Sequence, residues 1–223
     1  SGAAAGTAPT LAQLNALGVT GVTADNLAAV QAAIAATAND GSGVDSLSEL
    51  QTIASNAAAQ AAAAITTISD AAQANTATAT TPAATVYSAA GVTGVTDGNL
   101  AAINNALNSA AVTGALTDTA AEIQDLVTAY VAILAGADAD ASNDNATAIT
   151  AQYTAIGVTD ATDRTTSLVN DRIDGLSATE VDTVAQVQAL VSAAAAVISG
   201  AAAGTAPTLA QLNALGVTGV TAD

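Results

Sequence analysis

The chain has 223 residues, a formal net charge of −17 and no Phe, Trp, His, Cys, Met or Lys, and its 51% of hydrophobic residues are mainly Ala with Val, Leu and Ile. Because nucleic-acid affinity depends on Lys and Arg that neutralise phosphates, the charge argues against a nucleic-acid-binding protein. Zinc sites built on His or Cys, nucleophilic triads and Schiff-base lysines lack their residues. We therefore expect a protein that is not an enzyme and has no catalytic residue.

The first 25 residues, Ser1 to Asp25, recur letter for letter as Ser199 to Asp223. Exposed and buried positions match equally well, which shared helix propensity cannot produce. The identity indicates a tandem array with a period of 198 residues. We expect the chain to be one period, with the start of the next, of a longer repetitive protein.

The motif GVTGVT subdivides this period. It begins at Gly18, Gly91 and Gly216, and the related GVTDAT begins at Gly157. This spacing predicts three divergent copies of one helical repeat within the period. The predicted domains are residues 1–81 (repeat 1), 82–147 (repeat 2), 148–198 (repeat 3, divergent) and 199–223, the start of the next period.

The first helix of repeat 1 is predicted from about Thr10 to Leu17. Pro9 suits the first turn of this helix, where a missing N–H does no harm. Gly18 stands where a left-handed residue ends a helix, and Val19 is placed for the hydrophobic contact of a Schellman ending. The pattern therefore predicts a helix end at each GVTGVT motif.

The second helix of repeat 1 is predicted from about Ala24 to Thr37, with Thr23 as its N-cap and Val22 and Leu27 as a hydrophobic staple. Its apolar residues recur at helical spacing and predict one buried stripe: Leu27, Val30 and Ile34 in repeat 1, and Leu100, Ile103 and Leu107 in repeat 2.

The third helix of each repeat begins with a predicted capping box: Ser46-x-x-Glu49, Thr119-x-x-Glu122 and Thr183-x-x-Gln186. In repeat 1 this helix is expected to continue to about Ala72, roughly 40 Å at 1.5 Å per residue. Residues 56–68 are nearly apolar all round, so we expect burial on every face, beneath either the following repeat or a neighbouring chain. The predicted fold class is all-α, a tandem array of small three-helix up-down-up bundles.

An acidic linker in repeat 2 resembles half of a calcium loop. Asp138, Asp140, Ser142 and Asp144 alternate as ligands do in such a loop, but the twelfth position is Ile149 rather than a bidentate Glu. We prefer a solvated linker and keep weak calcium binding as the alternative. No other metal site and no cofactor is expected.

Repeat 3 departs most from the pattern. Ala161 and Thr166 replace the staple pair, Ala148 stands where Pro is expected, and the two Arg of the chain, Arg164 and Arg172, both lie here. We prefer drift over a contact site as the explanation.

Residues 184–204 are uncharged but rich in Ala, Ser and Gly, and they lack flanking Lys or Arg. We therefore expect a packed helix rather than membrane insertion.

The stretch GVTGVTADNLAAV, followed by an acidic turn and S/T-x-x-E-[LI]-Q, resembles the short helical repeats found in tandem in giant secreted adhesins and biofilm surface proteins of Gram-negative bacteria. The resemblance implies a structural role outside the cell, at the bacterial surface, and carries over no catalytic residue.

Two functions fit this resemblance. In the first, copies of the chain associate through Ala-rich helix faces and form or extend a fibre, since small residues let helices approach closely. In the second, the array is a single-chain stalk that presents a distant binding domain without lateral assembly. We prefer the fibre, although the −17 charge opposes association unless cations screen it.

Overall fold

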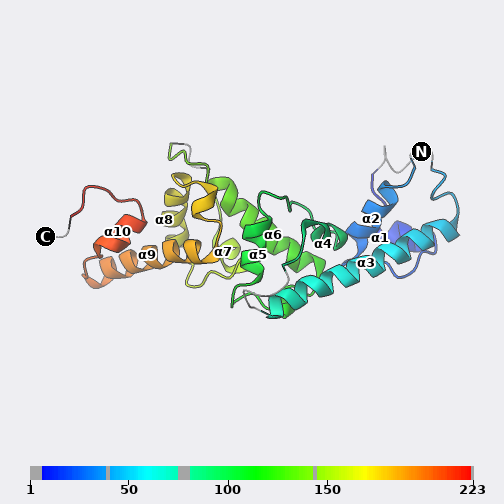
Figure 1. The fold of residues 1–223 in the computed structure, drawn as a ribbon, viewed down its shortest axis with the longest axis horizontal. Helices are drawn as coiled ribbons and strands as arrows, with labels where there is room; N and C mark the ends of the chain where they lie inside the picture. The colour runs from blue at the N-terminus through cyan, green and yellow to red at the C-terminus, as the bar shows by residue number, and fades with distance from the viewer. Residues whose placement is uncertain (1–6, 39–40, 75–80, 143–144, 222–223) are drawn as a thin grey trace. The chain divides into compact units, whose positions relative to one another are not determined.

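The computed structural model describes residues 7–38, 41–74, 81–142 and 145–221 (Figure 1). These residues form ten α-helices, two 3₁₀ helices and one isolated antiparallel bridge between Asp138 and Ser177, without a strand, so the all-α prediction is confirmed. The elements are α1 (Leu11–Ala16), α2 (Leu27–Ala35), α3 (Leu47–Ala74), α4 (Ala84–Ala89), α5 (Leu100–Leu107), η1 (Gly114–Leu116), α6 (Ala120–Gly136), α7 (Thr150–Ala155), α8 (Asp163–Asp174), η2 (Ala178–Glu180), α9 (Val184–Ala203) and α10 (Leu209–Ala214).

The helices belong to two compact units. The first unit holds α1 to α4, η1 and the first turns of α6, and the second holds α5, the rest of α6, α7 to α10 and η2. Within the first unit α4 packs on α3, and within the second α10 packs on α9. In these two cases the first helix of a predicted repeat lies against the third helix of the repeat before it, so each unit combines helices from more than one repeat.

The core of repeat 1 joins its three helices and the connector between α1 and α2. The buried members of this cluster are Leu14, Val19, Val22, Val30, Ile34, Ala54 and Ala57. Half-buried side chains at its edge include Leu27, from α2, and Leu50, from α3. Both predicted staple residues, Val22 and Leu27, thus reach this core.

All three predicted capping boxes are confirmed. The Glu49 N–H donates to the Ser46 Oγ at 3.2 Å, and the Ser46 N–H donates back to the Glu49 carboxylate at 3.1 Å. The equivalent reciprocal pairs join Thr119 to Glu122 and Thr183 to Gln186. Each box satisfies two of the N–H groups at a helix start that lack an intrahelical partner.

The predicted glycine endings are also confirmed. Gly18 has φ +87°, its N–H donates to the Asn15 carbonyl at 2.9 Å, and the Val19 N–H donates to the Leu14 carbonyl at 3.1 Å. This is the bond pair of a Schellman motif. The same pair ends α4, α7 and α10, at Gly91, Gly157 and Gly216.

Of the two helix starts predicted in repeat 1, the first is confirmed and the second is wrong. Helix α1 begins at Leu11, within one residue of the predicted start and after Pro9, and its N-cap Thr10 forms a capping box with Gln13. Thr23 does not cap α2, whose N-cap is Asn26; the Asn26 side chain instead accepts from the Thr23 N–H at 2.8 Å. That bond holds residues 24–26 in a turn, so α2 begins later than predicted.

The long helix α3 buries one stripe rather than every face, which corrects the expectation for residues 56–68. The buried positions follow steps of three and four: Ala54, Ala57, Ala61, Ala64, Ile68 and Ala71, with Ala72 beside them. Ala62 and Ala63 on the other side are exposed. Alanine methyl groups are small enough to leave in water at low cost, so an Ala-rich helix needs only one covered face.

The following repeat covers the far end of α3. Both α4 and η1 pack on it, the Ser69 hydroxyl donates to the Gly114 carbonyl at 2.9 Å, and the Gly114 N–H donates to the Gln73 side chain at 3.3 Å. The sequence left two candidates for this cover, the following repeat and a neighbouring chain. In the structure the following repeat covers the far end of α3.

The three tyrosines are the largest fully buried side chains, a role that the sequence analysis did not assign to them. Tyr87 and Tyr153 hold the position that Leu14 holds in α1, two residues before the last residue of the helix. The Tyr130 hydroxyl donates to the Val181 carbonyl at 3.2 Å, and that of Tyr153 to the Asn170 side chain at 2.6 Å. Burial raises the pKa of each phenol well above its ordinary value, so all three stay neutral in the folded protein.

Gly91 and Gly18 are both left-handed but differ in their surroundings. A Cβ on Gly91 would lie 3.0 Å from the Ala29 backbone nitrogen and 3.1 Å from the Ala28 Cβ, whereas the nearest atom to a Cβ on Gly18 is Leu47 Cδ2, at 3.8 Å. The end of α4 therefore approaches the backbone of α2 closely.

We predict that Gly91→Ala destabilises the chain more than Gly18→Ala. Each substitution places a side chain in the left-handed region, at about 1–2 kcal/mol. Gly91→Ala should cost about 1 kcal/mol or more in addition, because α2 has to shift. Urea unfolding followed by circular dichroism measures both, and equal losses would contradict the close approach.

Candidate functional site

A glutamine in the third helix of each repeat binds the backbone N–H and C=O of one threonine in the connector after the first helix. The Gln51 side chain accepts from the Thr20 N–H at 2.8 Å and donates to the Thr20 carbonyl at 3.0 Å. Gln124 binds Thr93 in the same way, at 2.8 and 3.1 Å, and Gln188 binds Thr159 at 2.8 and 3.2 Å. We call this the Thr–Gln clamp.

The clamp works because a glutamine side chain ends in the same amide group as the backbone. One carboxamide can therefore satisfy both the backbone N–H and the backbone C=O of a residue that has no helical partner. It fixes the connector on the third helix at Thr20, Thr93 and Thr159. Nothing in the local sequence pattern predicts this contact, although these glutamines all lie two residues after the last residue of the capping box.

A second polar contact ties the second helix to the entry of the first. The Gln31 amide donates to the Pro9 carbonyl at 2.8 Å, and the Asn170 amide donates to the Ala148 carbonyl at 2.9 Å. Pro9 and Ala148 hold aligned positions, nine residues before Gly18 and Gly157. The replacement of Pro by Ala148 in repeat 3 therefore leaves this contact unchanged, since the contact uses only the carbonyl.

Arg172 contacts the segment that follows repeat 3. Its Nε donates to the Ala214 carbonyl at 3.2 Å, at the end of α10, where a positive charge is favourable. The structure thus gives Arg172 a contact role, against the preference for drift.

The weak calcium candidates are engaged in the loop's own hydrogen bonds. Asp138 accepts from the Asp140 N–H at 3.0 Å and from the Asn145 amide at 2.7 Å, and Asp140 accepts from the Ser142 N–H at 3.1 Å. Asp144 lies outside the described residues. Among the side chains that are described, no group of three or more His, Cys, Asp or Glu could hold a metal ion.

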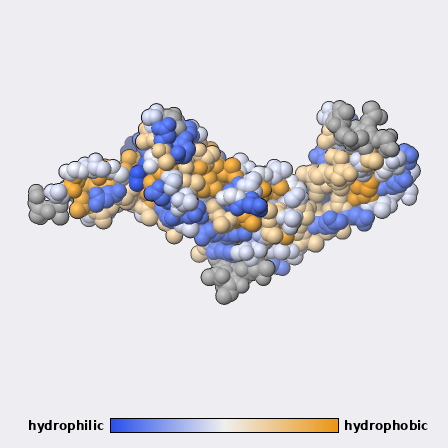
Figure 2. All heavy atoms as spheres, turned by 45° about the horizontal axis from the view of Figure 1, so that its top comes forward, coloured by the Kyte–Doolittle hydropathy of each residue, from blue (hydrophilic) through white to orange (hydrophobic). Residues whose placement is uncertain are grey.

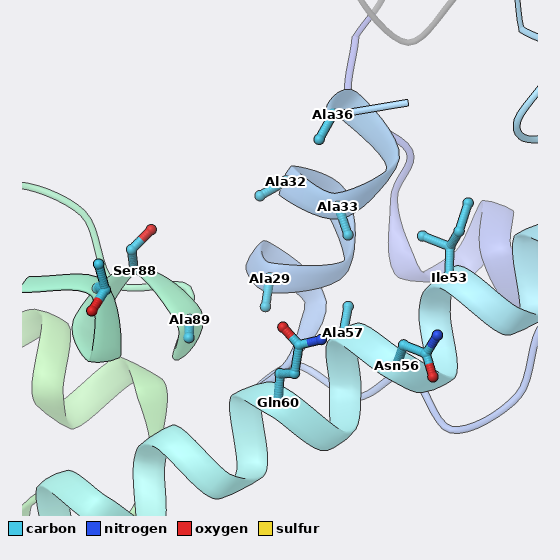
Figure 3. A pocket seen from close by; sticks show the side chains of 11 residues that line it. Ala29, Ala32, Ala33, Ala36, Ile53, Asn56, Ala57, Gln60, Ser88 and Ala89 are labelled. Atoms are coloured by element: carbon cyan, nitrogen blue, oxygen red, sulfur yellow. The ribbon is translucent and has the colours of Figure 1, made fainter. Parts of the chain in front are cut away.

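A groove of about 510 Å³ in the first unit is lined by uncharged side chains of α2, α3 and α4. Figure 3 shows Ala29, Ala32 and Ala33 of α2 on one side, with Ser88 and Ala89 of α4 opposite. Gln60 and Asn56 of α3 supply amides at its floor. No lining side chain is an acid or a base, so the groove offers no group for proton transfer.

Helix α9 is long and apolar enough, by length and composition, to cross a membrane. It packs on α8 and α10 within the second unit, and it buries a stripe that includes Val187, Leu190, Val191 and Ala194. Helix α9 thus packs against other helices of the second unit, as its Ala-rich composition predicts.

In two capping boxes the Glu is paired with an Asp that lies directly before the box. A hydrogen bond to Glu122, and then the charge of Glu122, raise the pKa of Asp118. The bond from Thr119 lowers the pKa of Glu122. Asp45 and Glu49 repeat this arrangement in repeat 1. In repeat 3 the partner of the box is Gln186, which carries no charge.

Comparisons with protein-family models, curated proteins and solved structures find no match to this chain.

We predict that Gln124→Ala exposes the Thr93 peptide. Losing two hydrogen bonds should cost about 1–3 kcal/mol, and the Thr93 amide should exchange its hydrogen faster. Gln60→Ala, in the exposed part of α3, is the control. Unchanged protection of Thr93 would show that the clamp does not hold the connector.

We predict that Asp118→Asn stabilises the fold at neutral pH. The stability that Asp118 contributes is present when it is protonated and falls as pH rises through its raised pKa, so a permanently neutral amide retains that contribution. The gain should shrink as pH falls, since wild-type Asp118 then becomes protonated. Urea midpoints across this pH range measure the difference. Asp118→Asn in a Glu122→Gln background should show no such pH-dependent gain, and a gain that persists there would refute the pair.

Proposed function

We propose that the chain is a structural repeat region of an extracellular bacterial surface protein, which forms or extends a fibre and performs no catalysis. The observation that supports this proposal best is the Thr–Gln clamp, which recurs at Thr20, Thr93 and Thr159 with nearly the same bond lengths. A junction that repeats along one chain suits a protein that extends by adding copies of one unit. The absence of Cys and Met makes the chain insensitive to oxidation, which suits the outside of a cell.

In this proposal each repeat is a three-helix unit with a short first helix and a long third helix. Repeat 1 comprises α1, α2 and α3, whose side chains share one core cluster. The third helix also supports the first helix of the next repeat, as α3 supports α4 and α9 supports α10. Neighbouring repeats therefore depend on each other, as they do in solenoid proteins.

Copies of the chain are the proposed partners, through the exposed Ala-rich face of α3. Ala62 and Ala63 lie on this face, where small side chains let another helix approach closely. The net charge of −17 opposes such contacts, so association should depend on cations that screen it.

A single-chain stalk that presents a distant binding domain is the second candidate. It is favoured by the cover of α3, because α4 and η1 of the same chain already occupy its far end. A stalk of this kind needs no lateral contact between chains.

Electron microscopy of the purified chain, with and without millimolar calcium, tests the proposal. We expect ordered fibres that become more abundant with calcium, and we expect Ala62→Glu with Ala63→Glu to reduce them through charge on the contact face. Ser48→Glu, in the exposed first turn of α3, is the matched control. Separate single chains under every condition would contradict the fibre and favour the stalk.

A further inference from the structure

The groove between α2, α3 and α4 combines an apolar wall with two carboxamides. On α2 its lining residues follow steps of three and four along one side of the helix, from Ala29 to Ala36. On α3 Asn56 and Gln60 supply the carboxamides (Figure 3). The part of the first unit at the right of Figure 2 has a mainly hydrophobic surface between polar patches.

Repeat 2 shows what lies at the corresponding place on its own helices. Counted from the GVTGVT motif of each repeat, Asn105 of α5 aligns with Ala32, and Tyr130 of α6 aligns with Ala57. Ala32 and Ala57 both line the groove. Both aligned side chains hydrogen-bond one backbone segment, residues 181–184 at the start of α9.

This segment is bound at both of its ends. The Tyr130 hydroxyl donates to the Val181 carbonyl at 3.2 Å, and the Val184 N–H donates to the Asn105 Oδ1 at 2.8 Å. The side chains of Val181 and Val184 are buried. Helices α5 and α6 therefore receive the start of a helix at the place that is open in repeat 1.

In repeat 1 the following repeat is held too far along the third helix to fill the groove. Helix α3 has 28 residues, whereas α6 has 17. The residues just before α6 are bound by Ser69 and Gln73, about three to four turns beyond Ala57. Gln60 stays exposed, whereas Ile133, which aligns with it, is 1% exposed. The following repeat is present in the chain, so its displacement leaves the groove open.

The carboxamides of Asn56 and Gln60 suit a peptide backbone. In the described part of the chain neither side chain forms a hydrogen bond with another residue. The Thr–Gln clamp shows that a carboxamide on the same helix, that of Gln51, binds the backbone N–H and C=O of one residue. Asn56 and Gln60 lie one turn apart on one face of α3. They can bind the backbone of a segment whose apolar side chains lie on the Ala wall of α2.

We propose that the groove between α2, α3 and α4 binds the start of a helix from another protein, in the way that α5 and α6 bind residues 181–184. The occupant carries two apolar residues three positions apart, as Val181 and Val184 are, and few acids. Asn56 and Gln60 bind its backbone, and α2 contacts its apolar side chains. The net charge of −17 on every copy of this chain opposes a second copy as the occupant and favours a neutral or basic partner. The contact involves one copy of the chain, so it requires no fibre.

A neutral peptide tests the site in the full chain. The probe has the sequence of residues 177–190, with Glu180→Gln, Asp182→Asn and blocked ends. Nuclear magnetic resonance of the isotope-labelled chain should show saturable shifts of the Asn56 and Gln60 side-chain amides and of backbone amides along α2. No saturable shift at millimolar peptide overturns the proposal.

The matched control peptide carries Val181→Asp and Val184→Asp in addition. It should produce no shifts, because its two charges would lie against the apolar wall of α2. Equal shifts from both peptides would overturn the assignment of the two apolar residues to the groove.

Variants of the chain locate the binding site. Ala32→Trp fills the groove from α2 and should weaken peptide binding about tenfold or more. Asn56→Ala with Gln60→Ala should weaken it about tenfold, because two hydrogen bonds are lost. Ala59→Trp, at an exposed position of α3 outside the groove, should leave binding unchanged. All four positions are exposed, so circular dichroism should show an intact fold.

Two results from these variants and from the chain alone would contradict the proposal. Peptide binding that survives Ala32→Trp overturns the groove as the site. Shifts of the groove signals that grow with the concentration of the chain alone overturn the assignment to another protein and identify a second copy as the occupant.

Discussion

The fold depends on the hydrogen bonds by which a third helix holds the connector after a first helix. A six-residue helix is too short to be stable by itself, and α3 contributes mainly alanine methyl groups to the core beside α1, so hydrogen bonds supplement the packing. The carboxamides of Gln51, Gln124 and Gln188 each form two hydrogen bonds with the backbone N–H and C=O of one connector residue. With the Schellman endings at Gly18, Gly91 and Gly157, they determine where each first helix ends and the direction in which the chain continues.

Large side chains are placed where the alanines leave space. Tyr87 and Tyr153 fill the position that Leu14 occupies in α1, and along α3 the contacts need only methyl groups at Ala54, Ala57 and Ala61. Small residues let helices approach closely, and the three tyrosines are the largest fully buried side chains. Gly91 follows the same rule, because it has no side chain and lets the end of α4 approach the backbone of α2 closely.

The acidic side chains mainly accept hydrogen bonds at helix starts and within loops, rather than forming a ligand site. Glu49 and Glu122 complete capping boxes, and Asp138 and Asp140 accept hydrogen bonds within their own loop. Carboxylates at the start of a helix are also favoured by its dipole. This arrangement leaves most of the charge at the surface, where it opposes association at low salt and can be screened by cations.

The sequence by itself determined the local features of this protein: the all-α class, the Schellman endings, the three capping boxes and the identity of the terminal segments. These depend on residues within one turn of each other, so a spacing such as Ser46-x-x-Glu49 is enough to predict them. Only the tertiary structure decided the partners of each helix. It showed the clamp between Thr20 and Gln51, the burial of only one face of α3, and the contact of Arg172 with α10. The start of α2 also needed the structure, because Thr23 and Asn26 both suit an N-cap and only the observed bond between them selects Asn26. The clearest case is the repeated segment, in which identical residues bury Val19 and expose Val217. Burial depends on what lies across from a side chain, and no local pattern can specify that.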